Sequence, residues 1–188
     1  MHVRQMSISY QPEQDRILVR VSTSEERELQ FWFTRRLTLG VTPLMERIVT
    51  ETAAGRGGPA TTHLASADAI TKKAMADFNH SETIRSADFS TPYRLPETAK
   101  PLFESPLLIT EVNIAPLAGG SLRLQCAEKL SGSAQTRRFE LALSNTLTHA
   151  FMHLFERAVV ASQWRELHAA DRTTPSAAPA DPAPGYLN

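Results

Sequence analysis

Two distant stretches of this chain repeat one pattern, and a repeat restricts the possible folds because each copy must form the same unit. Residues 29–49 and 139–159 align without a gap at an offset of 110 and share six identities in 21 positions. In the first stretch the identical residues are Leu37, Thr38, Leu44, Glu46, Arg47 and Val49. Two unrelated amphipathic segments can match by chance, but the shared order of residue types favours an internal duplication.

The residues before position 34 alternate between apolar and polar types, which is typical of strands with one buried face. Three such segments follow one another with short polar connections, so we expect an antiparallel meander. The expected inward residues are Met6, Ile8 and Tyr10, then Ile17, Val19 and Val21, then Leu29, Phe31 and Phe33.

The apolar spacing then changes to that of a helix. The apolar positions of this helix are Leu37, Val41, Leu44, Met45 and Ile48. Thr34 is a favourable N-cap. Pro43 lies inside the helix and predicts a kink near Gly40. The alternative is a break, with Thr42 as the cap of a second helix that begins at Pro43.

The same order returns in the second half of the chain. Its expected inward strand residues are Leu108, Thr110, Val112 and Ile114, then Leu122, Leu124 and Cys126, then Phe139, Leu141 and Leu143. Ser144 is the expected cap of a helix with apolar residues Leu147, Phe151, Leu154, Phe155 and Ala158. The second strand of each half aligns at an offset of 105. We therefore expect Phe33 and Leu143 to occupy equivalent buried positions, and likewise Leu44 and Leu154.

These patterns predict an α+β fold of two βββα repeats related by a pseudo-two-fold, with the helices packed on the apolar faces of antiparallel sheets. We expect the first repeat at 1–52 and the second at 107–168. Residues 53–106 would hold a glycine-rich loop, an inserted helix and a proline-rich linker. Residues 169–188 are proline-rich without apolar periodicity, which predicts a disordered tail. Its last residues, 186–188, form either a docking motif or a frayed end.

The inserted helix has a short apolar stripe of its own. We expect Ser66 to cap it, and its inward residues to be Ile70, Ala74, Met75 and Phe78. Two further apolar residues, Trp164 and Leu167, lie off the stripe of the last helix. Either that helix ends near Ser162, or the two residues form an exposed patch for a partner.

Composition limits the classes of function. The 188 residues carry 20 Lys and Arg against 20 Asp and Glu, so the formal net charge is zero. A polybasic nucleic-acid binder would show a basic excess. A single cysteine excludes an internal disulfide and a multi-cysteine metal site. No apolar run is long enough for a transmembrane helix and no secretory signal begins the sequence, so we expect a cytoplasmic protein.

Repeated units of several antiparallel strands and one helix resemble the Whirly and PUR families of single-stranded nucleic-acid binders. The resemblance covers the topology, with three strands per repeat here against four in those families. The segments YQPEQDRILVR and FWFTRR are also similar to an uncharacterised bacterial protein family, and that resemblance implies no activity.

The two repeats differ where the first expected helix begins. Trp32 precedes Arg35 and Arg36, and two cations there oppose the helix dipole. A bound anion would remove the conflict, so the sequence predicts an anion or nucleic-acid site with Trp32 as a stacking surface and with Arg16 and Arg20 nearby. The alternatives are that the arginine pair binds Glu26 or Glu28 while Trp32 packs on the inserted helix, or that this surface contacts a protein.

Few residues have the types and spacing that catalysis requires. His149, His153 and Glu156 lie on one face of the last helix and form a weak metal-site candidate, but that face is opposite the apolar stripe and should meet solvent or an interface. Cys126 has inward parity and should be a buried structural thiol.

We therefore expect a non-catalytic adaptor or regulatory module that binds a protein partner or itself, without a cofactor. The second hypothesis is a single-stranded nucleic-acid or nucleotide binder that uses Trp32 and its arginines. The third is a metal-dependent hydrolase that uses the histidines of the last helix.

Overall fold

The computed structural model describes residues 3–54, 68–89, 91–132 and 135–166, and confirms a mixed α+β fold with antiparallel sheets. Sheet A contains β1 (Val3–Gln11), β2 (Arg16–Thr23) and β3 (Arg27–Thr34), and two short strands, β4 (Lys100–Pro101) and β5 (Leu107–Leu108), that run parallel to β3. Sheet B contains β6 (Glu111–Pro116), β7 (Leu122–Glu128) and β8 (Arg137–Leu143). The helices are α1 (Arg35–Ala54), α3 (Ala69–Ser86), α4 (Asn145–Ser162) and the short 3-10 turn η2 (Ala118–Gly120).

Strand register follows the alignment of the two halves. Ile17 lies opposite Phe33 in sheet A, and Leu122 lies opposite Leu143 in sheet B. The next facing pairs are Val19–Phe31 and Val21–Leu29 in sheet A, and Leu124–Leu141 and Cys126–Phe139 in sheet B. All of these side chains are buried. A shift of one residue would turn a strand's apolar set toward solvent, so the hydrophobic pattern excludes such a shift, and the short turns between the strands set the rest of the register.

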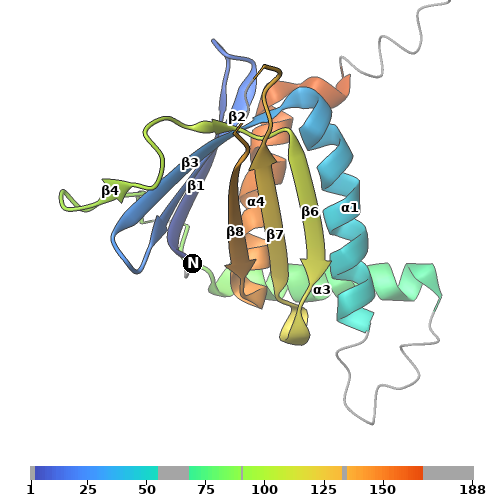
Figure 1. Ribbon diagram of the computed structural model, residues 1–188. Coiled ribbons are helices and arrows are strands. Elements are labelled where there is room, and N and C mark those ends of the chain that lie inside the picture. The colour runs from blue at the N-terminus through green and yellow to red at the C-terminus, as the bar shows by residue number, and fades with distance from the viewer. Residues whose placement is uncertain (1–2, 55–67, 90, 133–134, 167–188) are drawn as a thin grey trace, which may run out of the picture.

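The helices pack across the two halves of the molecule. Helix α4 lies along β1 of sheet A as well as β8, while α1 contacts β6 of sheet B as well as β3 (Figure 1). Thr38 and Thr148, which are aligned in the repeat, are both fully buried. The duplication and the pseudo-two-fold relation stay predictions.

The helix starts agree with the sequence. Thr34 Oγ1 accepts a hydrogen bond from the Leu37 backbone N–H, and Ser144 Oγ accepts one from Leu147 N–H. Helix α1 is continuous through Pro43, so the alternative of a break is wrong. The Thr42 hydroxyl donates back to the Thr38 carbonyl one turn earlier.

Four expectations about individual positions are wrong. Leu44 and Leu154 are half-buried rather than buried, because they lie at the edges of the helix faces. Leu108 and Thr110 do not belong to the first strand of sheet B: β5 pairs with β3, Thr110 is exposed, and β6 starts only at Glu111. The chain thus crosses from one sheet to the other between Leu108 and Glu111.

The inserted helix also differs from the prediction. Helix α3 begins at Ala69 with Asp68 as its N-cap, and Ser66 lies outside the described residues. Ile70, Ala74 and Phe78 point outward, which reverses the expected orientation. Figure 1 shows α3 crossing the ends of α1 and α4 and projecting beyond α1. The glycine-rich loop from residue 55 onward, Leu167, and the predicted tail with its residues 186–188 lie outside the described residues.

Candidate binding surfaces

The outer face of sheet A carries four residues that we call the Trp32 face: Arg16, Leu18, Arg20 and Trp32. Leu18 on β2 lies directly opposite Trp32 on β3, and the two arginines lie two positions to either side of Leu18 on the same face. Trp32 and Arg16 are half-buried, and Arg20 is exposed. In the part of the chain that the structure describes, neither arginine forms a salt bridge.

The two arginines that follow β3 have separate environments. Arg35 is half-buried, and its Nη2 lies 3.3 Å from the carbonyl oxygen of Trp164, to which it donates a hydrogen bond. Arg36 is exposed. The alternative in which Arg35 binds Glu26 or Glu28 is wrong, because Arg35 holds the chain just beyond α4 instead. The Trp32 face therefore keeps Arg16 and Arg20 as its cations, while Arg35 belongs to the packing of α4.

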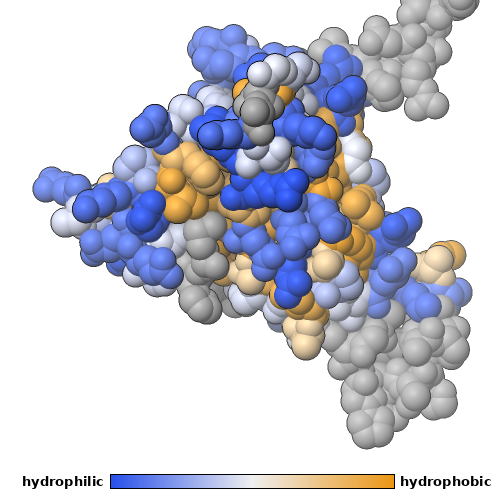
Figure 2. Space-filling model, in the orientation of Figure 1, coloured by the Kyte–Doolittle hydropathy of each residue, from blue (hydrophilic) through white to orange (hydrophobic). Residues whose placement is uncertain are grey.

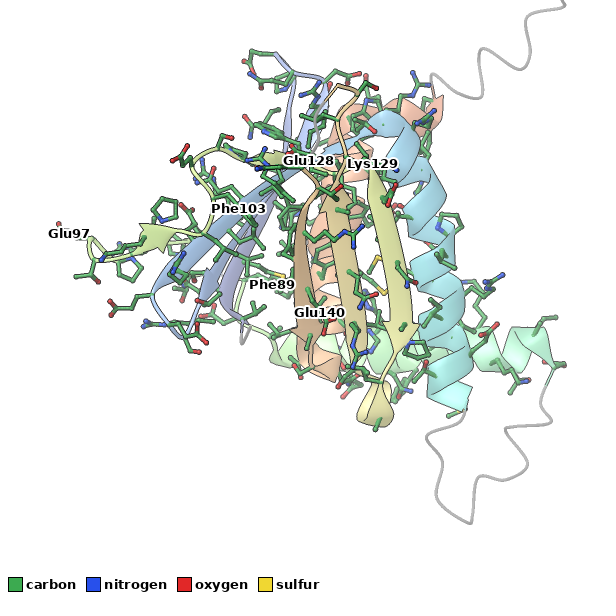
Figure 3. All side chains as sticks on the ribbon, in the orientation of Figure 1. Phe89, Glu97, Phe103, Glu128, Lys129 and Glu140 are labelled. Atoms are coloured by element: carbon green, nitrogen blue, oxygen red, sulfur yellow. The ribbon has the colours of Figure 1, made fainter. Side chains whose placement is uncertain are left out.

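On the equivalent outer face of sheet B, a neighbouring carboxylate neutralises Arg123. Arg123 Nε lies 3.3 Å from Glu140 Oε1, and Gln125 donates to the same carboxylate at 3.0 Å. Asn113 donates to Gln125 in turn. This face is mostly hydrophilic and lies toward the viewer (Figure 2), with Glu140 at its surface (Figure 3). Arg138 on this face is exposed and, among the described residues, forms no salt bridge, so the sheet A face differs by the tryptophan that lies beside its arginines.

One end of the outer face of sheet A is covered by the linker. The Tyr93 hydroxyl donates to Glu28 Oε1 at 3.1 Å, and Gln30 donates to the other oxygen at 2.8 Å. Burial raises the pKa of the Tyr93 hydroxyl, and the negative charge of Glu28 raises it further, so the phenol remains a donor. The open part of the face is consequently small: Leu18 is 6% exposed, Arg16 and Trp32 are half-buried, and Arg20 is exposed.

Helix α3 presents its apolar residues to solvent. Ile70 is 81% exposed and Phe78 is 66% exposed, and Ala74 between them is also exposed. We call these three residues the α3 stripe. The side of α3 that meets the rest of the molecule is mainly polar or small: Lys72, Met75, Ala76, Asn79, His80 and Thr83. Apolar surface marks the projecting end of α3 in Figure 2.

The three helices enclose a histidine cluster. His149 is 2% exposed, and its Nδ1 lies 3.0 Å from Nδ1 of His80 on α3. The expectation that this face of α4 meets solvent is therefore wrong for His149, because α3 covers it. His153 lies beside His80 and Phe89. Burial lowers the pKa of His80, and the neighbouring His153 lowers it further.

The predicted metal ligands do not assemble into a metal site. Glu156 is bound by Arg165, at 2.5 Å and 2.9 Å from its two oxygens. No group of three or more histidine, cysteine, aspartate or glutamate residues suited to a metal ion occurs among the described residues. A pocket of about 260 Å³ does open here between α1, α3 and α4. The aligned residues Glu46 and Glu156 both line it, above the apolar side chains of Met45 and Phe155.

Cys126 is a buried structural thiol, as expected: it is 3% exposed, and burial raises the pKa of its thiol to about 12.

The structure also shows which contacts the segment YQPEQDRILVR makes. Asp15 Oδ1 accepts hydrogen bonds from the Tyr10 hydroxyl at 2.9 Å and from Trp164 Nε1 at 2.6 Å. Helix α4 ends at Ser162, so the exposed-patch alternative for Trp164 is wrong: this side chain is 1% exposed.

Glu128 is a further structural residue that the sequence analysis did not single out. This carboxylate is 5% exposed, accepts the Leu108 backbone N–H at 2.7 Å and is paired with Arg137. Arg137 in turn lies over the ring of Phe103. Figure 3 shows Glu128 at the end of sheet B that the linker crosses. No local pattern marks this residue, because its partners come from β5 and β8.

Comparison with known proteins gives no relative: no family model, no curated protein and no solved structure matches this chain. Within the described residues, no helix has the length and apolar character needed to cross a membrane. The Trp32 face and the α3 stripe are therefore the features from which a function can be inferred.

Proposed function

We propose that this protein is a non-catalytic binding module that associates with a protein partner through the α3 stripe. The observation that carries the proposal is the reversed orientation of α3. Its two largest apolar outward residues, Ile70 and Phe78, are 81% and 66% exposed while Lys72 and Asn79 face inward. A helix that only completed a core would bury these apolar side chains.

Burial by a partner would recover the free energy that this exposure costs. Removing apolar surface from water contributes about 25 cal/mol per Å², and aromatic residues contribute strongly to interfaces. The polar inward side of α3 explains why the helix does not turn about its own axis to bury the α3 stripe. Its His80 is held by His149, and rotation would break that contact.

Site-specific photo-crosslinking tests this proposal. A photoreactive amino acid at position 78, introduced in the cells that make the protein, should give a discrete crosslinked protein that mass spectrometry identifies. The matched control is position 160, because Val160 on α4 is 64% exposed and lies outside the α3 stripe. If position 78 gives no product, or the same products as position 160, the proposed function is wrong.

A second candidate function is the binding of single-stranded nucleic acid on the Trp32 face. Two arginines without salt bridges beside a half-buried tryptophan offer phosphate contacts and a stacking surface. Titration of a fluorescent oligonucleotide should show binding that weakens as salt increases. The Arg16→Glu/Arg20→Glu variant should lose this binding, whereas Arg123→Gln on sheet B should keep it. Salt-independent binding, or none, contradicts this candidate.

A further inference from the structure

We infer that the partner of the α3 stripe is the same stripe of a second copy of this chain, packed antiparallel. The inference rests on the proposed function, and it adds the identity of the partner. Three features of α3 support it: the shape of the stripe, the position of its charges and the place of the helix in the molecule.

The stripe is complementary to itself. Its residues are spaced four apart, so Ile70, Ala74 and Phe78 lie along one ridge of the helix. A two-fold axis at Ala74 brings Ile70 of one copy opposite Phe78 of the other. The small side chain of Ala74 lets the two helices approach closely at the centre. Each large apolar side chain then has an apolar neighbour across the axis.

The charges beside the stripe are also complementary. Lys73 and Asp77 lie on the same side of the ridge, and they form an exposed intrahelical pair with Nζ 3.2 Å from Oδ2. In the antiparallel arrangement, Lys73 of one copy lies about half a turn along the axis from Asp77 of the second copy. The two Lys73 side chains are equally close along the axis, so the contact has two attractive lysine–aspartate pairs against one lysine–lysine repulsion.

The place of α3 in the fold leaves this surface accessible. The N-terminal part of the helix projects beyond α1 (Figure 1), and the apolar surface at its end is bordered by hydrophilic side chains (Figure 2). The stripe is short, so we expect a weak, concentration-dependent dimer rather than an obligate one.

Charge reversal tests the inference by sedimentation velocity at low salt over a series of protein concentrations. The wild type should shift toward a dimer. Lys73→Asp alone places four acidic groups along the contact, and Asp77→Lys alone places four lysines there. Each variant should raise the apparent dissociation constant at least tenfold. An equimolar mixture of the two should associate again, because each acidic copy now meets a basic one. Circular dichroism shows whether α3 remains helical in each variant.

Dimerisation that returns on mixing cannot arise from the intrahelical Lys73–Asp77 pair, because neither variant contains that pair. The apolar part is tested by Ile70→Ser/Phe78→Ser, which should remain monomeric, against Val160→Ser, which should dimerise as the wild type does. A wild type that stays monomeric at every concentration overturns the inference, as does a mixture that fails to associate. If crosslinking at position 78 captures a different protein, self-association is wrong and the proposed function stands. If it captures none, the proposed function fails as well.

Discussion

Trp164 holds the end of α4 against the first hairpin. Its indole N–H donates to Asp15, its ring meets the edge of Tyr10, and its carbonyl accepts from Arg35. Asp15 occupies the turn between β1 and β2 with φ 48°, a conformation that aspartate tolerates better than most residues. This cluster accounts for Arg35 at the start of α1, where its charge opposes the helix dipole.

Replacing Trp164 with phenylalanine should lower the free energy of unfolding by about 2 to 3 kcal/mol. The change removes a hydrogen bond to a carboxylate and leaves a small cavity. Urea unfolding followed by circular dichroism measures the loss. The control is Arg36→Ala, whose exposed side chain should change stability by less than about 0.5 kcal/mol. Equal effects of the two substitutions would show that Trp164 does not hold the hairpin.

Arg137→Ala should destabilise the protein by about 2 to 4 kcal/mol. It leaves the buried Glu128 carboxylate without its cation, and this cost stays below that of a fully buried pair because the Arg137 side chain is 33% exposed. Arg138→Ala, at the exposed neighbouring position, is the matched control for urea unfolding. A loss no larger than that of the control would mean that the Leu108 N–H alone satisfies Glu128.

At the scale of elements, α3 shows how environment decides which side of a helix is buried. Its inward side meets α4 through His80 and His149 and packs Ala76 against the pocket. At least one Nδ1 of the histidine pair must lack a proton for their hydrogen bond to form. This hydrogen bond between α3 and α4 therefore depends on the protonation of the pair.

The free energy of unfolding should fall as the pH is lowered from about 7 to 5. The pKa of His80 is lower in the folded protein than the ordinary 6.5, so the unfolded chain binds more protons in this window. Stability from this group is complete above pH 6.5 and is lost as the pH falls toward the folded pKa. Urea midpoints across this range measure the slope, and His80→Asn should flatten it. An unchanged slope in the variant would assign the pH dependence to other groups.

At the scale of the whole molecule, α1 and α4 each pack on the sheet of the other half as well as on their own. Helix α4 covers β1 and α1 contacts β6, so the two halves share one hydrophobic core. Neither sheet would keep its apolar face covered if the other half were removed. We therefore expect the halves to unfold together.

Phe33→Ala and Leu143→Ala should each cost about 3 to 5 kcal/mol, because both side chains are buried at equivalent positions of the two sheets. Leu44→Ala and Leu154→Ala should cost less, about 1 to 2 kcal/mol, because those side chains are half-buried. Urea unfolding of the four variants should give single transitions with matched losses inside each pair. Two separate transitions would contradict the shared core, and one silent member of a pair would contradict the duplication.

The sequence by itself determined the inward residues of β2, β3, β7 and β8 and the caps of α1 and α4. Period-two and helical spacing depend on local geometry, so the alternation of Ile17, Val19 and Val21 and the caps at Thr34 and Ser144 follow from neighbouring residues. The orientation of α3, the burial of His149 and the role of Glu128 required the tertiary structure. Each depends on partners far away in the chain, and a short stripe such as Ile70 to Phe78 has the same spacing whether a core or a second molecule covers it.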